Sequence, residues 1–258
     1  MINLNLFRKP VAVDSALHGD LRLAHGTVDW SIAADTNAAF VAAVEFGDAC
    51  CDFPLLFVDA GKDEKTGAPL VASIAALGLE QRQNLFVEGG SWRSGYVPAL
   101  LRAYPFGLAR ADDGRVLVVI DEAFEGWSRT EGQPLFDAER KPSPLLEEVR
   151  ERLETVEAEI GRTRAVCSLL LAEGLLRPMR FDAELPDGGK VAVEGFMTLD
   201  EDKFAALPDA KVLELHKAGV LALVHAHQIS LRHMRRMADW HVARRAAAAT
   251  AAAPTAPR

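Results

Sequence analysis

Three turn-forming segments, each lying between two apolar runs, constrain the fold of this chain most. An Asp-Gly pair or a short polar glycine-containing loop between apolar runs is the strongest local signal for a β-hairpin. Three such hairpins predict a largely antiparallel sheet. The turns are GKDEKTG (61–67), Asp112-Asp113-Gly114 and Pro186-Asp187-Gly188-Gly189, and the runs around them are 55–58 with 69–77, 105–111 with 116–121, and 181–185 with 190–196.

A long amphipathic helix is predicted over residues 144–173. Ser143 is a favourable N-cap residue, and Pro144 suits the first helical position. Apolar side chains then recur at alternating spacings of three and four residues, and Gly174 is a typical C-terminal stop. This helix should be the longest or second-longest of the molecule. Its stripe consists of Leu146, Val149, Leu153, Val156, Ile160, Cys167 and Leu170, with Thr163 in the gap.

Shorter elements are predicted on both sides of this helix, with most helices in the second half of the chain. Short strands are expected at 21–23 and 28–32, and a short helix near 94–104. The later helices are expected to begin at the capping box Thr198-x-x-Glu201, at Pro208-Asp209 with an end at Gly219, and near Val220 with an end at about Arg245.

These elements together predict an α+β fold, a mainly antiparallel mixed sheet with flanking helices concentrated in the C-terminal half. The 258 residues, 49% of them hydrophobic, can bury a sizeable core without metal or disulfide bonds. We expect one domain over 1–245. The segment 246–258 contains mostly alanine and proline, offers no large side chain to bury, and is predicted to be disordered.

Charge and cysteine content restrict the class of protein. A formal net charge of -8 makes a nucleic-acid partner a poor expectation, because nucleic acids are polyanions. No apolar run reaches the roughly 18 residues of a spanning helix, and the N-terminal segment does not resemble a signal peptide. Cys50, Cys51 and Cys167 form no disulfide pattern and are predicted to be buried apolar thiols. We therefore expect a cytoplasmic protein.

Motifs for phosphate binding, metal binding and nucleophilic catalysis are absent from the sequence. Gly89-Gly90 is a glycine pair without Walker or Rossmann spacing, and Ser91 and Ser94 lie in no nucleophile elbow. No metal site is predicted, and neither a cofactor nor the oligomeric state can be assigned.

Five histidines lie late in the chain, and one of them is predicted to face the core. His227 shares a helical stripe with Val220, Val224 and Met234, whereas His225 lies about 200° away around the helix. The two cannot chelate one metal from an intact helix, so His227 is interpreted as a structural histidine before a ligand or base. The basic side chains Arg232, Arg235, Arg236, Arg244 and Arg245 indicate a solvated face, or a docking surface for an acidic partner.

The middle of the chain carries the candidate site. The open end of the second hairpin should gather Tyr104, Asp121 and Glu122, with Phe106 opposite Asp121 if Asp113-Gly114 is a two-residue turn. The dipole of the preceding helix would then raise the pKa of a carboxylate there and make it a candidate general acid. A structural ion-pair cluster is the alternative. The full candidate set is Glu45, Trp92, Arg93, Tyr96, Tyr104, Asp121, Glu122 and His227.

The chain resembles the SapC family of bacterial proteins over about residues 10–240. The resemblance is carried by EFGDACCDFPLLFV, LGLEQRQNLFV, WRSGYVPALLRAYPFGLAR, GQPLFDAERKPSP, RTRAVCSLLLAEGLL and GFMTLDEDKFAALPDAKVLELHKAGVLALVHAHQISL, in this order. The family name comes from surface-layer protein export, and members often carry a label of peptide transport. Similar proteins are often encoded beside TonB-dependent receptors. The resemblance implies no catalytic residues.

Two hypotheses about function follow. The first is an accessory or binding protein with a protein or peptide partner, linked to surface-layer or peptide export or to outer-membrane nutrient uptake. The second is an enzyme that modifies a peptide or small molecule with carboxylates as acid and base, grouped around Tyr104, Asp121 and Glu122 with Glu45 as an addition. A deep pocket with a strongly perturbed carboxylate would favour the enzyme, and a flat apolar patch the binding protein.

Overall fold

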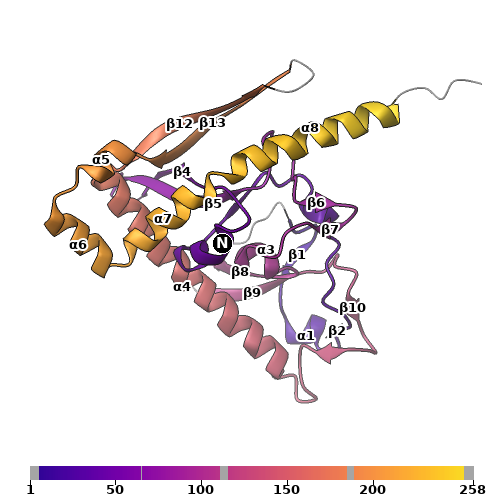
Figure 1. The fold of residues 1–258 in the computed structure, drawn as a ribbon. Coiled ribbons are helices and arrows are strands. Elements are labelled where there is room, and N and C mark those ends of the chain that lie inside the picture. The colour runs from indigo at the N-terminus through magenta and orange to yellow at the C-terminus, as the bar shows by residue number, and fades with distance from the viewer. Residues whose placement is uncertain (1–5, 65, 111–115, 185–188, 253–258) are drawn as a thin grey trace, which may run out of the picture.

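A five-stranded antiparallel sheet lies at the centre of the molecule (Figure 1). The computed structural model describes residues 6–64, 66–110, 116–184 and 189–252. The first and third predicted hairpins, β4–β5 and β12–β13, are confirmed and pair with each other through β13 and β4. In sheet order the strands are β12 (Leu176–Glu184), β13 (Lys190–Leu199), β4 (Leu55–Lys62), β5 (Pro69–Ala76) and β3 (Ala38–Phe40).

The second predicted hairpin forms a separate three-stranded sheet. Phe106 pairs with Ile120, one residue away from the expected partner Asp121. The expected register was wrong because it assumed a two-residue turn at Asp113-Gly114, which lies outside the described residues. A regular hairpin in the observed register needs an odd number of loop residues. In sheet order the strands are β1 (Pro10–Ala12), β9 (Val116–Asp121) and β8 (Phe106–Arg110).

Two small sheets complete the β structure. One has the order β10-β2-β11, and the other is the two-stranded β6–β7 hairpin. Their strands are β2 (Arg22–Leu23), β6 (Val87–Glu88), β7 (Ser91–Trp92), β10 (Trp127–Ser128) and β11 (Gln133–Pro134).

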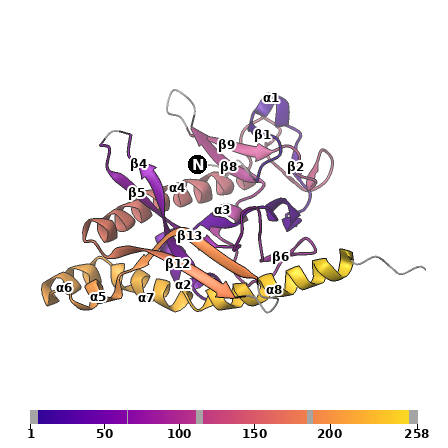
Figure 2. The ribbon, with the colours of Figure 1, turned by 90° about the horizontal axis from the view of Figure 1, so that it is seen from above.

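Helices cover the five-stranded sheet from both sides. Figure 2 shows α4 along one side of it and α5 to α8 along the other. Together with the antiparallel sheets, this confirms the predicted α+β class. The longer helices are α4 (Pro144–Ala172), α6 (Asp209–Lys217), α7 (Val220–Ser230) and α8 (His233–Ala252). The short ones are α1 (Ser15–His18), η1 (Trp30–Ala33), η2 (Ala43–Glu45), α2 (Phe46–Ala49), α3 (Ala99–Arg102) and α5 (Glu201–Ala205).

Helix α4 is the predicted amphipathic helix, and it connects two hydrophobic cores. The Ser143 hydroxyl accepts a hydrogen bond from the Leu146 N–H, as expected of an N-cap. The N-terminal part of its stripe packs under β8 and β9, and the C-terminal part packs with the five-stranded sheet. Thr163 fills the gap in the stripe, where its hydroxyl accepts a hydrogen bond from Ala43 N–H at 2.8 Å.

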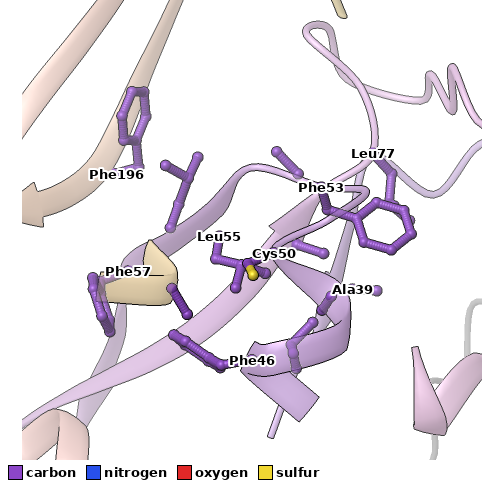
Figure 3. Close-up of a cluster of buried hydrophobic side chains, with 14 of the residues drawn as sticks. Ala39, Phe46, Cys50, Phe53, Leu55, Phe57, Leu77 and Phe196 are labelled. Carbon is purple, nitrogen blue, oxygen red and sulfur yellow. The ribbon is translucent and has the colours of Figure 1, made fainter. Parts of the chain in front are cut away.

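The larger core lies under the five-stranded sheet and is rich in phenylalanine. Figure 3 shows Phe46 from α2, and Cys50 directly after this helix, beside Leu55 and Phe57 from β4. Phe53 and Leu55 are fully buried in this core. Cys50 and Cys167 are buried as predicted, but the prediction was wrong for Cys51, which is exposed in the turn that follows α2.

The last helix differs from the sequence prediction in two ways. It is interrupted after Ser230. There the Ser230 hydroxyl donates to His227 O and competes for this carbonyl with the backbone N–H that would bind it in a continuous helix. The same hydroxyl accepts from Leu55 N–H at 2.9 Å, so β4 holds the break in place. At its other end α8 continues to Ala252, beyond the expected Arg245. Alanine has the highest helix propensity, which explains helix where disorder was predicted for 246–252.

Part of the basic face of α8 packs against the protein. Arg236 donates to Asp52 O, and Arg244 donates to Asn84 O at 2.8 Å. The interpretation of a solvated basic face holds for Arg244, which is exposed, but was wrong for Arg236, which is half-buried.

Three further local predictions were wrong. Residues 28–32 form no strand, because Asp29 caps the 3-10 helix η1 there. The helix expected near 94–104 is limited to α3, since Pro98 takes an extended conformation before it. Thr198 lies within β13, and Asp200 caps α5 in its place.

Candidate functional site

An open cleft of about 650 Å³ lies between the N-terminal segment, η1, the β6–β7 turn and the turn after β9. Its size is that of a small-molecule site. Two of the predicted site residues, Trp92 and Tyr104, line it. The charged and aromatic side chains that also line the cleft are Arg8, His25, Asp29, Trp30, Phe124 and Glu125.

One wall of the cleft is a pair of half-buried tryptophans. The ring centroids of Trp30 and Trp92 lie 5.2 Å apart at an interplanar angle of 55°. Behind them, Trp92 stacks on Phe86 with centroids 6.0 Å apart. The Trp92 indole N–H donates to Tyr96 O at 2.8 Å, which fixes the ring. The indole N–H of Trp30 forms no hydrogen bond to any residue that the structure describes, so it is free to meet a ligand.

The glycine pair 89–90 positions this wall. Gly89 and Gly90 have φ angles of 56° and 77°, the left-handed conformation that a two-residue hairpin turn requires. A Cβ on Gly90 would lie 2.6 Å from Asp29 Oδ1. Trp30 N–H donates to Gly90 O at 2.8 Å, so the turn and η1 are joined. The pair that matched no phosphate motif therefore shapes the cleft.

Another part of the cleft wall is formed by Tyr104 and Phe124, whose rings meet edge to face with centroids 5.6 Å apart. The Tyr104 hydroxyl donates to Asp121 Oδ2 at 2.9 Å. Burial, and after it the Asp121 carboxylate, raises the pKa of Tyr104 well above its usual value. Tyr104 therefore stays protonated and supplies a fixed aromatic surface.

Asp121 lies behind this wall and is fully buried. Its carboxylate accepts hydrogen bonds from Arg8 N–H at 2.9 Å, Lys9 N–H at 2.8 Å and Ala123 N–H at 3.0 Å, besides that from Tyr104. Burial alone would raise the pKa of Asp121, but these hydrogen bonds outweigh burial and hold the pKa below its usual value. The expected rise in the pKa of Asp121 was therefore wrong.

Glu122 points away from the cleft into an ion pair. Its carboxylate lies 2.6 Å from Lys9 Nζ and 3.0 Å from His18 Nε2. The His18 Nδ1 accepts from Asp14 N–H, so the hydrogen lies on Nε2 and donates to Glu122. Hydrogen bonds from Lys9 and His18 lower the pKa of Glu122, again opposite to the expected direction.

Glu45, Tyr96 and Arg93 lie in structural contacts outside the cleft. The buried Glu45 accepts from Tyr96 OH at 2.7 Å, Ala99 N–H at 2.7 Å and Ala42 N–H at 2.8 Å. Burial and then Glu45 raise the pKa of Tyr96. Arg93 lies 4.3 Å above the Trp240 ring and pairs with Glu88 at 3.3 Å. The Tyr96–Glu45 hydrogen bond joins η2 to the chain before α3. The contact between Arg93 and Trp240 joins the β6–β7 hairpin to α8.

His227 has the structural role predicted for it. It is 1% exposed, lies 2.7 Å from Leu55 O through Nδ1, and accepts from Leu199 N–H at 3.2 Å through Nε2. The Nδ1 therefore carries the hydrogen. Burial lowers the pKa of His227 and keeps the ring neutral.

The sequence did not single out Arg8, Asp29, Trp30, Phe124 or Glu125. They come from three segments far apart in the sequence, and none lies in a recognised motif. Two sequence features could have indicated the cleft. The Gly89-Gly90 pair was interpreted only as a tight turn, and Asp29-Trp30 lay in a segment predicted to be a strand. In the part of the chain that the structure describes, no three His, Cys, Asp or Glu side chains gather as metal ligands.

Fold and cleft together define an α+β protein with an open cleft that is partly walled by aromatic side chains. The chain belongs to the SapC family, whose model matches residues 13–237. Neither the curated proteins nor the solved structures compared with this chain include a match. Within the described ranges, no helix is both long and apolar enough to cross a bilayer.

Proposed function

We propose that this protein is a binding protein whose aromatic cleft holds a peptide or another small molecule. The observation that carries the proposal is the convergence of Trp30, Trp92 and Phe124 on one open cleft of about 650 Å³. Ligand sites combine apolar and aromatic walls with a few polar groups, and this cleft has that composition. A half-buried tryptophan pair with a free indole N–H is well suited to hold an apolar group and orient it.

Binding is favoured over acid–base catalysis because the candidate carboxylates are already occupied. Asp121 accepts four hydrogen bonds, and Glu45 accepts three. A general acid needs a pKa near the working pH, whereas the pKa values of Asp121 and Glu122 are lowered. Asp121 instead holds Arg8, Tyr104 and Ala123, which line the cleft.

In the cell, we propose an accessory role in surface-layer or peptide export or in outer-membrane nutrient uptake, performed from the cytoplasm. Membership of the SapC family supports the link to export and uptake. The three free cysteines support a reducing compartment. Cell fractionation tests the location: recovery in the cytosolic fraction is expected, and recovery in the membrane fraction after a high-salt wash would contradict it.

Native mass spectrometry of freshly purified protein tests the binding proposal. The wild type should retain a ligand, and Ser91→Trp should lose it, because Ser91 is exposed on the cleft wall and an indole there fills the space. Glu88→Trp is the matched control: Glu88 is the cross-strand partner of Ser91 in the same hairpin but does not line the cleft. Equal retention by Ser91→Trp and the wild type would contradict the proposal.

A further inference from the structure

The acidic and basic side chains of the cleft carry charges of both signs, and they form no ion pairs with the residues that the structure describes. Arg8 is exposed at the cleft, and its guanidinium forms no ion pair with any described residue. Glu125, also exposed, forms none within the same ranges. Asp29 uses one carboxylate oxygen to accept from Ser31 N–H at 2.9 Å. The cleft thus offers one cation and two carboxylates beside its aromatic wall.

Arg8 is fixed at its backbone while its side chain stays free. The Asp121 carboxylate accepts from the N–H groups of Arg8 and Lys9. These hydrogen bonds fix the backbone at Arg8 and so limit the positions that its guanidinium can reach. A guanidinium with a fixed base and an unused fork of donors suits a carboxylate, which it can bind through two parallel hydrogen bonds.

Asp29 lines the same cleft as Arg8 but forms no ion pair with it. Hydrogen bonds with Ser31 lower the pKa of Asp29, and the charge of Arg8 lowers it further to a smaller extent. Because no ion pair joins the two side chains, a ligand in the cleft can supply a charge to each.

Resting on the binding function proposed above, we propose that the cleft binds a zwitterion, a free amino acid or a short peptide. Its carboxylate pairs with Arg8, and its ammonium faces Asp29. An apolar or aromatic side chain of the ligand lies against Trp30 and Trp92. A polyanion fits poorly because Asp29 and Glu125 would repel it. A simple cation leaves Arg8 unpaired, and an apolar ligand leaves all three charges unused.

Ligands with each charge removed in turn test this inference. The probes are the free amino acids and a mixed dipeptide library, each prepared unmodified, C-terminally amidated and N-acetylated, with affinity measured by calorimetry. Unmodified members should bind. Amidation should weaken binding by roughly ten- to a hundredfold, because a hydrogen-bonded charged partner contributes about 1.5–3 kcal/mol. The two sets of probes distinguish free amino acids from peptides.

Variants of the cleft assign each charge. Arg8→Gln should remove the preference for carboxylate over amide, and Asp29→Asn should remove the preference for free amine over acetyl. Asn still caps η1, so the fold should be kept, and thermal unfolding checks this. Arg235→Gln, an exposed arginine on α8 outside the cleft, is the control and should keep both preferences.

Three results with the probes would overturn the zwitterion inference. These are equal binding of modified and unmodified probes, a carboxylate preference that survives in Arg8→Gln, and binding of no probe in any form. A retained ligand that Ser91→Trp loses, but that carries no carboxylate or amine, would leave the binding function standing and overturn only the zwitterion.

Discussion

At the scale of single residues, the buried polar groups hold loops together. Asp121, Glu45 and His227 are all buried, and each receives or makes hydrogen bonds to backbone far away in the sequence. A buried polar group without partners is costly, so each of these side chains specifies one arrangement of the chain around it. The structural role of His227 could be predicted from its helical stripe, but the roles of Asp121 and Glu45 could not, because their partners lie on other segments.

Asp121→Asn should lower the free energy of unfolding by about 3 kcal/mol, since an amide cannot accept four hydrogen bonds as a carboxylate does. The folded-state pKa of Asp121 is lowered, so its contribution is present above the usual aspartate pKa of about 3.9 and is lost as the pH falls. Urea unfolding at neutral and acid pH measures both effects. Asp59→Asn, exposed in β4, should change stability by less than about 0.5 kcal/mol; equal effects of the two would contradict the account.

His227 should make the protein less stable in acid. Its folded-state pKa is lowered, so the unfolded state takes up a proton first, and stability is lost as the pH falls below about 6.5. From about pH 7.5 to about pH 5.5 this one group should cost about 1 kcal/mol of unfolding free energy. His227→Gln should reduce the pH dependence. The exposed His225 on the same helix provides the control, and a His225→Gln variant with the same loss would refute the assignment.

At the scale of elements, prediction succeeded where the signal was local. The β4–β5 and β12–β13 hairpins and α4 follow from turn residues and apolar spacing within one segment. The break after Ser230 depends on the N–H of Leu55, a residue on β4 that no local pattern can reveal. The cap of α5 could not be predicted from local sequence either. Thr198 fits a capping box, but it pairs within the sheet as part of β13 and therefore does not cap the helix.

Ser143→Ala should cost about 1 kcal/mol of stability, because Ser143 is the N-cap of α4 and its hydroxyl also donates to Pro134 O at 2.6 Å. Chemical denaturation gives the difference. Thr155→Ala in the exposed middle of the same helix should be neutral or slightly stabilising, since alanine is the better helix former. A Ser143→Ala variant as stable as the wild type would mean that the N-cap contributes nothing.

At the scale of the whole molecule, the cleft is assembled from segments that are distant in the sequence. Arg8, Trp30, Trp92 and Phe124 come from four such segments, and their meeting depends on the pairing of β1 with β9 and of η1 with the β6–β7 turn. The fold class could be predicted because it needs only the types of element. The cleft could not, because two of its walls are loops whose positions are set by tertiary hydrogen bonds.

The crystal structure of the protein purified from its own cells under native conditions tests the central claim most directly. The account predicts a ligand in the cleft, with an apolar group between Trp30, Trp92 and Phe124 and a polar group at Arg8. An empty cleft in a protein that carries its ligand at another place would contradict it.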